Sequence, residues 1–115
     1  MLEEGIQASF DCAQACTACA DACLSEHNVD ALRRCVQSSL DCADVCEVTG
    51  RILSRQTAPD LALIRALLLA CVTACQACRT ECQRHAKHHL QCYVCADACR
   101  RCEAACNRLL AALPA

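Results

Sequence analysis

The chain has 115 residues, a formal net charge of −2 and a pI near 6.0, and its acidic and basic residues are interspersed. This length supports one domain over residues 1–115, and the charge offers no basic surface for nucleic acid or an anionic membrane. Cysteine contributes 16 residues, while two glycines and two prolines leave few turns, so the composition favours an all-α fold.

The N-terminal segment, residues 1–4, has no basic region of the kind that begins an export signal. The longest apolar run, around 66–72, is too short to span a bilayer. We therefore expect a cytoplasmic protein with no membrane partner. Because thiols are kept reduced in the cytosol, this many cysteines favours metal binding or catalysis over disulfides.

The first two predicted helices cover about residues 2–25 and 29–55, and Asn28 or Asp30 is suited to cap the second. A third helix begins with Pro59 and Asp60 and runs to about residue 85.

A fourth predicted helix runs to about residue 113, although no glycine or proline separates it from the third. Continuing the third helix's cysteine stripe predicts an inward residue at position 96, whereas the cysteines fall at Cys95 and Cys99. A turn at 87–89 explains this slip, and a single helix over 59–113 would be about 80 Å long. The sequence therefore predicts an antiparallel up-down four-helix bundle.

The cysteines form four groups in which neighbours are almost always three or four positions apart, the spacing that keeps side chains on one helix face. Thiols therefore take the inward positions that leucine fills in an ordinary bundle, which predicts a cysteine-lined core. Ser39 stands where the second stripe calls for another cysteine. The sixteen residues are Cys12, Cys16, Cys19, Cys23, Cys35, Cys42, Cys46, Cys71, Cys75, Cys78, Cys82, Cys92, Cys95, Cys99, Cys102 and Cys106.

The two ends of the predicted bundle differ in chemistry. The four histidines share one end, where His85 continues the third cysteine stripe, so His85, His88 and His89 are candidate metal ligands, and His27 fits an ordinary surface residue. We interpret that end as open. The other end collects apolar inward residues and is interpreted as closed: Leu53, Leu61, Ile64, Leu68, Leu109 and Leu113.

Several uses of the thiols compete. Free cysteine packs well as a small apolar residue, so a plain helical bundle is one of them. Disulfides within a helix are excluded because residues three or four apart have Cβ atoms about 5–6 Å apart, against about 3.8 Å in a disulfide. Bonds between helices remain as oxidation products. An iron–sulfur site would need a different cysteine order from the run Cys92, Cys95, Cys99 and Cys102.

Closed zinc sites need four converging ligands with breaks between the sets, whereas these thiols form continuous columns. A thiol redox protein would need an accessible cysteine of low pKa, and inward residues in mid-helix do not fit that role. Copper(I) suits the columns best, since it is a soft ion content with two or three bridging thiolates, and on the order of fifteen ions would fit. Each Cu(I) with one thiolate is neutral, so a filled core carries little charge.

The C-x3-C-x2-C-x3-C pattern on the first and third helices, the five-cysteine stripe on the fourth and the histidine cluster between the last two resemble the four-helix-bundle copper storage proteins of bacteria. The resemblance covers nearly the whole chain and is to the cytosolic branch. It implies a core loaded with many Cu(I) ions, uptake at one open end, a role in copper homeostasis and assembly into a homotetramer. Ser39 departs from the pattern and bears on the number of ions at its level.

These observations predict a cytosolic, non-enzymatic Cu(I) store. Its expected metal ligands are the sixteen cysteines together with His85, His88 and His89. A zinc–thiolate protein and a thiol redox protein are the alternatives.

Overall fold

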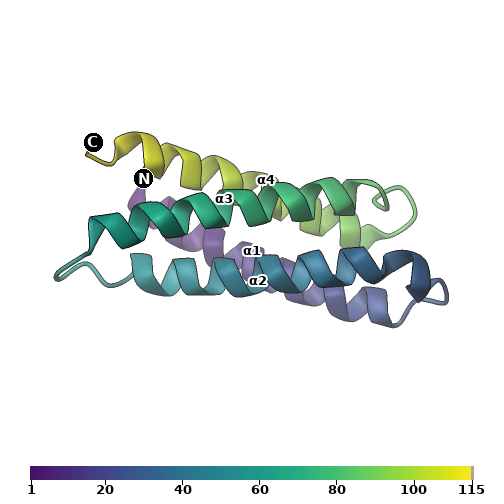
Figure 1. Ribbon diagram of the computed structural model, residues 1–115. Helices are drawn as coiled ribbons and strands as arrows, with labels where there is room; N and C mark the ends of the chain where they lie inside the picture. Colours follow the sequence, from purple (N-terminus) through teal and green to yellow (C-terminus); the bar gives the residue numbers. More distant parts are fainter. Residues whose placement is uncertain (115) are drawn as a thin grey trace.

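The computed structural model describes residues 1–114 and arranges them as an elongated antiparallel bundle (Figure 1). The helices are α1 (Leu2–Leu24), α2 (Arg33–Leu53), α3 (Leu61–Gln83) and α4 (Leu90–Ala112), and a short 3-10 helix, η1 (Val29–Leu32), precedes α2. The bundle measures 48 × 19 × 19 Å. The up-down four-helix bundle predicted from the cysteine spacing is confirmed.

Each helix packs against two neighbours: α1 and α3 both contact α2 and α4. The α1–α2 and α3–α4 connections lie at one end of the bundle, and the α2–α3 connection lies at the other with both chain termini (Figure 1). The first of these ends, formed by residues 25–32 and 84–89, is called the histidine end below because it holds all four histidines. Its position agrees with the predicted topology.

The helix starts are only partly as expected. Pro59 and Asp60 were expected in the first turn of α3, but the helix begins at Leu61 and Asp60 caps it, with its carboxylate accepting a hydrogen bond from the Leu63 amide at 3.1 Å. The prediction that Asn28 or Asp30 caps α2 was wrong, since the residue at the cap position is Leu32. Residues 29–32 form the 3-10 turn instead, so α2 begins at Arg33, and the Asp30 carboxylate accepts from that residue's guanidinium at 2.6 Å.

The turn between α3 and α4 covers residues 84–89, which includes the predicted turn at 87–89. It resets the helical phase, so that Cys95 and Cys99 are completely buried. Ala96, at which the α3 stripe would arrive, is also buried, at 7% exposed.

The apolar end is built largely as predicted. Leu53, Ile64, Leu68 and Leu109 are buried, and Leu113 is partly buried against them. Leu61 was wrongly placed in this group, since it is 45% exposed. It is the first residue of α3, and its side chain lies outside the layer that the other leucines fill.

Helix α3 is the one helix among residues 1–114 that is long and apolar enough to cross a membrane, by length and composition only. The uninterrupted apolar run at 66–72 is short, but the 23-residue helix as a whole meets the criterion, so the expectation that no segment is long enough was wrong. In the bundle its cysteine face packs against α2 and α4, and its outer face exposes Leu63 and Leu69.

Candidate metal centre

The core of the bundle is a continuous column of sulfur. Fifteen of the sixteen cysteine side chains are completely buried, and Cys19 is 1% exposed. Sulfurs on different helices approach one another to between 3.5 Å, for Cys35 and Cys82 on adjacent helices, and 4.0 Å, for Cys16 and Cys78 on diagonally opposite ones. An S–S bond is about 2.05 Å long. All sixteen residues are free thiols, so the core presents metal ligands and no disulfide framework.

The stripes of the helices meet in groups of four, which the sequence did not predict. In each group the sulfurs all lie within 4.8 Å of one another, and neighbouring groups share residues such as Cys12 and Cys16. The prediction that the columns contain no converging sets of four ligands is therefore wrong: the column contains quartets, and the trio Cys19, Cys82 and Cys95 joins the last of them to the others. The quartets include Cys12/Cys16/Cys42/Cys99, Cys12/Cys46/Cys75/Cys102, Cys16/Cys78/Cys95/Cys99 and Cys19/Cys23/Cys35/Cys92.

Burial favours the neutral form of the core thiols when no metal is bound, because a thiolate loses its solvation there. It raises the pKa of the Cys23 and Cys92 thiols in this way. Within residues 1–114 the buried polar side chains are Ser9, Ser39 and Thr49, so no buried cation offsets a thiolate. An empty core of neutral thiols packs as an ordinary apolar interior.

Ser39 occupies the gap in the α2 stripe, as expected from the sequence. Its hydroxyl lies 3.6 Å from the sulfur of Cys78, 3.8 Å from that of Cys95 and 3.9 Å from that of Cys82. Sequence reasoning missed Ser9, whose hydroxyl lies 3.9 Å from the Cys102 sulfur. Continuing the α1 stripe three residues back from Cys12 would have found it.

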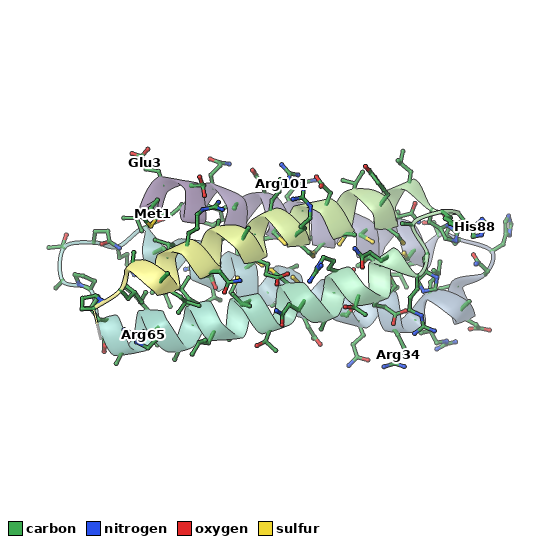
Figure 2. All side chains as sticks on the ribbon, turned by 90° about the horizontal axis from the view of Figure 1, so that it is seen from above. Met1, Glu3, Arg34, Arg65, His88 and Arg101 are labelled. Carbon is green, nitrogen blue, oxygen red and sulfur yellow. The ribbon has the colours of Figure 1, made fainter. Side chains whose placement is uncertain are left out.

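At the histidine end, two histidines are partly buried and are held by carboxylates. His85 Nε2 lies 3.0 Å from a Glu81 oxygen, and His89 Nδ1 lies 3.3 Å from a Glu26 oxygen. His88 and His27 are exposed, and Figure 2 shows His88 projecting from the end of the bundle remote from Met1. The structure therefore places His85 and His89 partly inside the histidine end, each beside a carboxylate, and leaves His88 exposed.

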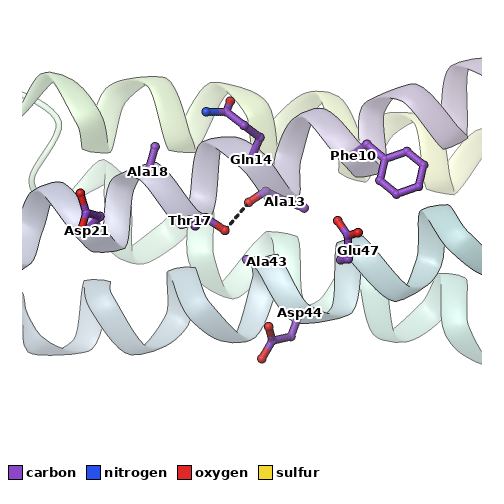
Figure 3. Close-up of a pocket in the computed structure, with 9 residues that line it drawn as sticks. All are labelled: Phe10, Ala13, Gln14, Thr17, Ala18, Asp21, Ala43, Asp44 and Glu47. Carbon is purple, nitrogen blue, oxygen red and sulfur yellow. Dashed lines mark hydrogen bonds between the residues drawn. The ribbon is translucent and has the colours of Figure 1, made fainter.

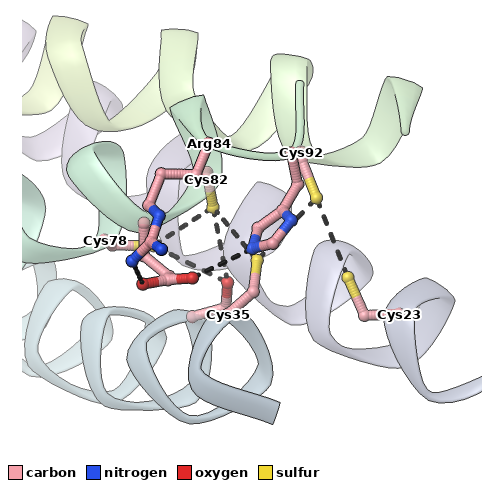
Figure 4. A network of polar contacts seen from close by, with 9 residues as sticks. Cys23, Cys35, Cys78, Cys82, Arg84 and Cys92 are labelled. Carbon is pink, nitrogen blue, oxygen red and sulfur yellow. Dashed lines mark hydrogen bonds and ion pairs between the residues drawn. The ribbon is translucent and has the colours of Figure 1, made fainter. Parts of the chain in front are cut away.

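Gln91 connects this polar group to the thiols. Its amide nitrogen donates to Glu26 at 3.2 Å and contacts the Cys23 sulfur at 3.8 Å. Figure 4 shows Cys23, Cys35, Cys82 and Cys92 meeting at this end, beside Arg84. Sequence reasoning missed Gln91 and both glutamates because their partners are on other helices or in a connection.

Leu32 is also fully buried, three residues before Cys35. It extends the α2 stripe with an apolar side chain, so the histidine end is not entirely polar. Sequence reasoning missed it, although the spacing of three from Cys35 is the same signal that placed the cysteines.

The largest surface hollow lies outside the sulfur column. A groove of about 690 Å³ between α1 and α2 is lined by residues that include Phe10, Asp21, Asp44 and Glu47 (Figure 3). It contains no cysteine or histidine, and its one hydroxyl, on Thr17, is already donated to the Ala13 carbonyl at 2.8 Å. The metal chemistry of the described residues is therefore concentrated in the core and at the histidine end.

The sequence model described as copper storage protein matches residues 1–111 of the chain. The chain therefore belongs to the copper storage protein family, a class of non-enzymatic metal stores, and the resemblance expected from the cysteine pattern is confirmed.

Solved structures give more particular relatives. A cytosolic copper storage protein from Streptomyces lividans, loaded with five coppers, is 54% identical with a TM-score of 0.96, over 98% of this chain and 94% of that chain. The same protein loaded with 10 copper equivalents is also 54% identical with a TM-score of 0.96, over 97% of this chain and 85% of that one. An uncharacterized cysteine-rich protein of Bacillus subtilis (strain 168), YhjQ, is 34% identical over 103 residues, covering 85% of this chain and 92% of the relative.

Proposed function

We propose that this protein is a cytosolic store that holds many Cu(I) ions on the thiolates of its core. The observation that carries the proposal is the continuous series of thiol groups that share members, with sulfurs on different helices 3.5–4.0 Å apart. Because Cu(I) accepts two or three soft ligands, one sulfur of such a chain can bridge two ions. The Streptomyces lividans relative, whose structures hold copper, supports the same reading.

The charge of the core favours a monovalent ion. Each thiol that binds Cu(I) loses one proton, so the pair of ion and thiolate is neutral. Ions can then accumulate side by side without leaving net charge in an interior that has no buried cation. A core that is neutral both empty and full folds before it loads.

The protein is proposed to be one domain, residues 1–115, with its ligands between positions 12 and 106. They are Cys12, Cys16, Cys19, Cys23, Cys35, Cys42, Cys46, Cys71, Cys75, Cys78, Cys82, Cys92, Cys95, Cys99, Cys102 and Cys106, with His85, His88 and His89 as transient ligands.

Copper is proposed to pass in and out at the histidine end. His85 and His89 are partly buried there, and Cys82 and Cys92 are the nearest thiols along the chain. A neutral imidazole binds Cu(I) more weakly than a thiolate does and can hand the ion inward. The other end is filled by Leu53, Leu68 and Leu109, which offer no ligand.

A homotetramer is proposed as the assembled form, following the family resemblance. Large apolar side chains exposed along α3 support an interface between copies, since Leu61, Leu63 and Leu69 are 45–54% exposed. The change Leu69→Glu should shift the mass measured by light scattering from a tetramer to a smaller species. A wild-type protein that is monomeric at micromolar concentration would contradict this part of the proposal.

The thiol redox alternative fits the structure poorly. Attack by a cysteine requires an accessible thiolate. No cysteine in residues 1–114 is more than 1% exposed, and burial raises the pKa of the two thiols nearest the histidine end, Cys23 and Cys92.

An anaerobic titration tests the storage proposal. Reduced protein is mixed with increasing Cu(I) in the presence of a chromophoric Cu(I) chelator, and the chelator signal reports free copper. We expect tight binding of roughly one Cu(I) per cysteine, because bridging lets every sulfur serve an ion. Saturation at about four ions or fewer would show closed four-ligand sites and would refute bridged storage.

A further inference from the structure

The quartet nearest the histidine end has the shape of a closed site for a divalent ion. It consists of Cys19 and Cys23 on α1, Cys35 on α2 and Cys92 on α4. The Cys92 sulfur lies 3.8 Å from that of Cys23 and 3.8 Å from that of Cys35. A zinc–sulfur bond of about 2.3 Å places the sulfurs of a regular tetrahedron about 3.8 Å apart. The two edges at Cys92 already have that length, and all four sulfurs lie within 4.8 Å of one another.

Shape alone does not distinguish this quartet from those deeper in the core. In the central quartet, Cys12 and Cys99 lie 3.8 Å apart, and the other measured edges that join them to Cys16 and Cys42 are 3.8–3.9 Å. Five of its six edges therefore match a regular tetrahedron, against two of those in the quartet at the histidine end. The two sites differ in how well their surroundings stabilise the negative charge that four thiolates and a divalent ion carry.

A divalent ion bound by four thiolates displaces four protons and leaves two negative charges uncompensated. Burying net charge without a partner is strongly unfavourable. Among residues 1–114 the core contains no buried lysine or arginine, and the central quartet is surrounded by further thiols. The deep quartets therefore disfavour divalent ions even though their geometry fits.

The quartet at the histidine end has a nitrogen donor that the others lack. Gln91 Nε2 lies 3.8 Å from the Cys23 sulfur, and it is the one side-chain nitrogen found against a cysteine sulfur in the described part of the chain. An N–H donor stabilises a thiolate, and charge near the end of the bundle is also better solvated than charge at its centre.

We propose that Cys19, Cys23, Cys35 and Cys92 form a tetrahedral site for one divalent thiophilic ion, Zn²⁺ or the chemically similar Cd²⁺, at the histidine end. The site uses thiols that the proposed copper store also uses, but its existence does not depend on copper storage. It is closed, because all four ligand positions are filled by sulfur.

The test uses reduced, metal-free, full-length protein without copper. Cd²⁺ is added anaerobically while the thiolate-to-metal charge-transfer absorption is followed, and a pH indicator counts released protons. Zn²⁺ is then measured by competition with a chelator. We expect one tight equivalent per chain, with four protons released for that ion.

Two cysteine variants locate the ion. Cys92→Ser removes a ligand of the proposed site, while Cys99→Ser removes an equally buried thiol of the same helix that belongs to the central quartet. We expect Cys92→Ser to weaken Cd²⁺ binding by at least about 100-fold, since even outer-shell changes at metal sites cost 10–100-fold. Cys99→Ser should leave the affinity nearly unchanged. Gln91→Ala should weaken binding by about 10-fold while keeping all four ligands.

Circular dichroism shows whether each variant is folded. If a variant is unfolded, the pair is replaced by Cys35→Ser, at the proposed site, with Cys42→Ser, in the central quartet, as its control. Two or more equivalents of similar affinity, no tight equivalent, or equal losses in the Cys92 and Cys99 variants would overturn the proposal. A chain that binds roughly one Cu(I) per cysteine but no tight Cd²⁺ would refute this site and leave the storage function standing. One tight Cd²⁺ together with few Cu(I) ions would support this site and refute the storage function.

Discussion

Replacing Ser39 by cysteine should raise the copper capacity by about one ion per chain. The Ser39 side chain is fully buried, and its hydroxyl lies 3.6–3.9 Å from the sulfurs of Cys78, Cys82 and Cys95. Those separations are the same as the sulfur–sulfur contacts elsewhere in the column, so a thiol at this position completes the α2 stripe. Because each bridging thiolate supports about one Cu(I), the expected gain is about one equivalent.

The substitution should leave the protein folded, at a cost in stability of at most about 1–3 kcal/mol. Sulfur is larger than oxygen, and slight overpacking of a closed core costs about 1–3 kcal/mol. The hydroxyl at this position contacts only sulfur, a weak hydrogen-bond partner, so its loss removes little. We expect the free energy of unfolding of the metal-free protein, measured by denaturant titration, to fall by no more than that amount.

The matched control is Ser38→Cys, the same change one residue away. Ser38 is only partly buried and lies off the cysteine stripe. Both variants and the wild type are titrated anaerobically with Cu(I) against a strong chelator, and capacities are compared per chain. An unchanged capacity in Ser39→Cys, or an equal gain in Ser38→Cys, would show that capacity does not follow the geometry of the column.

The metal-free, reduced protein should already be helical, so its circular dichroism should change little on copper loading; a coil spectrum before loading would contradict a preformed container. Changing His85, His88 and His89 together to alanine should slow copper transfer to a chelator, measured by stopped flow, far more than it alters capacity. Leu109→Ala, at the apolar end, should leave the transfer rate unchanged. Equal kinetics in the triple variant and the wild type would show that the histidine end is not the gate. Burial raises the pKa of Cys23 and Cys92, so the folded state keeps protons that the unfolded chain releases above about pH 8.5. The metal-free protein should therefore lose stability as pH rises beyond that value, by up to about 1.4 kcal/mol per pH unit for each such thiol; denaturation midpoints that rise between pH 8 and 10 would contradict this.

The cysteine period made most of the fold predictable. Cysteines spaced three and four residues apart over a whole segment lie on one face of a helix. The change in the phase of the cysteine stripe between Cys82 and Cys95 located the last turn. The same regularity predicted the burial of all sixteen thiols and the position of Ser39 in the column.

Contacts between elements were not predictable in this way. The pairing of Glu26 with His89, and of Gln91 with Cys23, depends on how α1 and α4 are rotated where they meet. The exposure of Leu61 depends on where the packed layer stops. Periodicity within one helix carries no information on contacts with other helices or on where the packed layer ends. It also cannot predict that the stripes converge into quartets, because that depends on how the helices pack together.

The burial of every thiol, combined with the proposed passage of copper at the histidine end alone, has a consequence for the order in which ions leave. Cys106 lies 14 residues beyond Cys92 on α4, about 21 Å deeper at 1.5 Å per residue. Under the proposed uptake route an ion at that depth can leave only after those above it, so the last copper to arrive is the first to depart. The upper ions then act as a quickly exchanged supply and the deepest as a slow reserve. Loading with one copper isotope and then a second would reveal this as early release of the second.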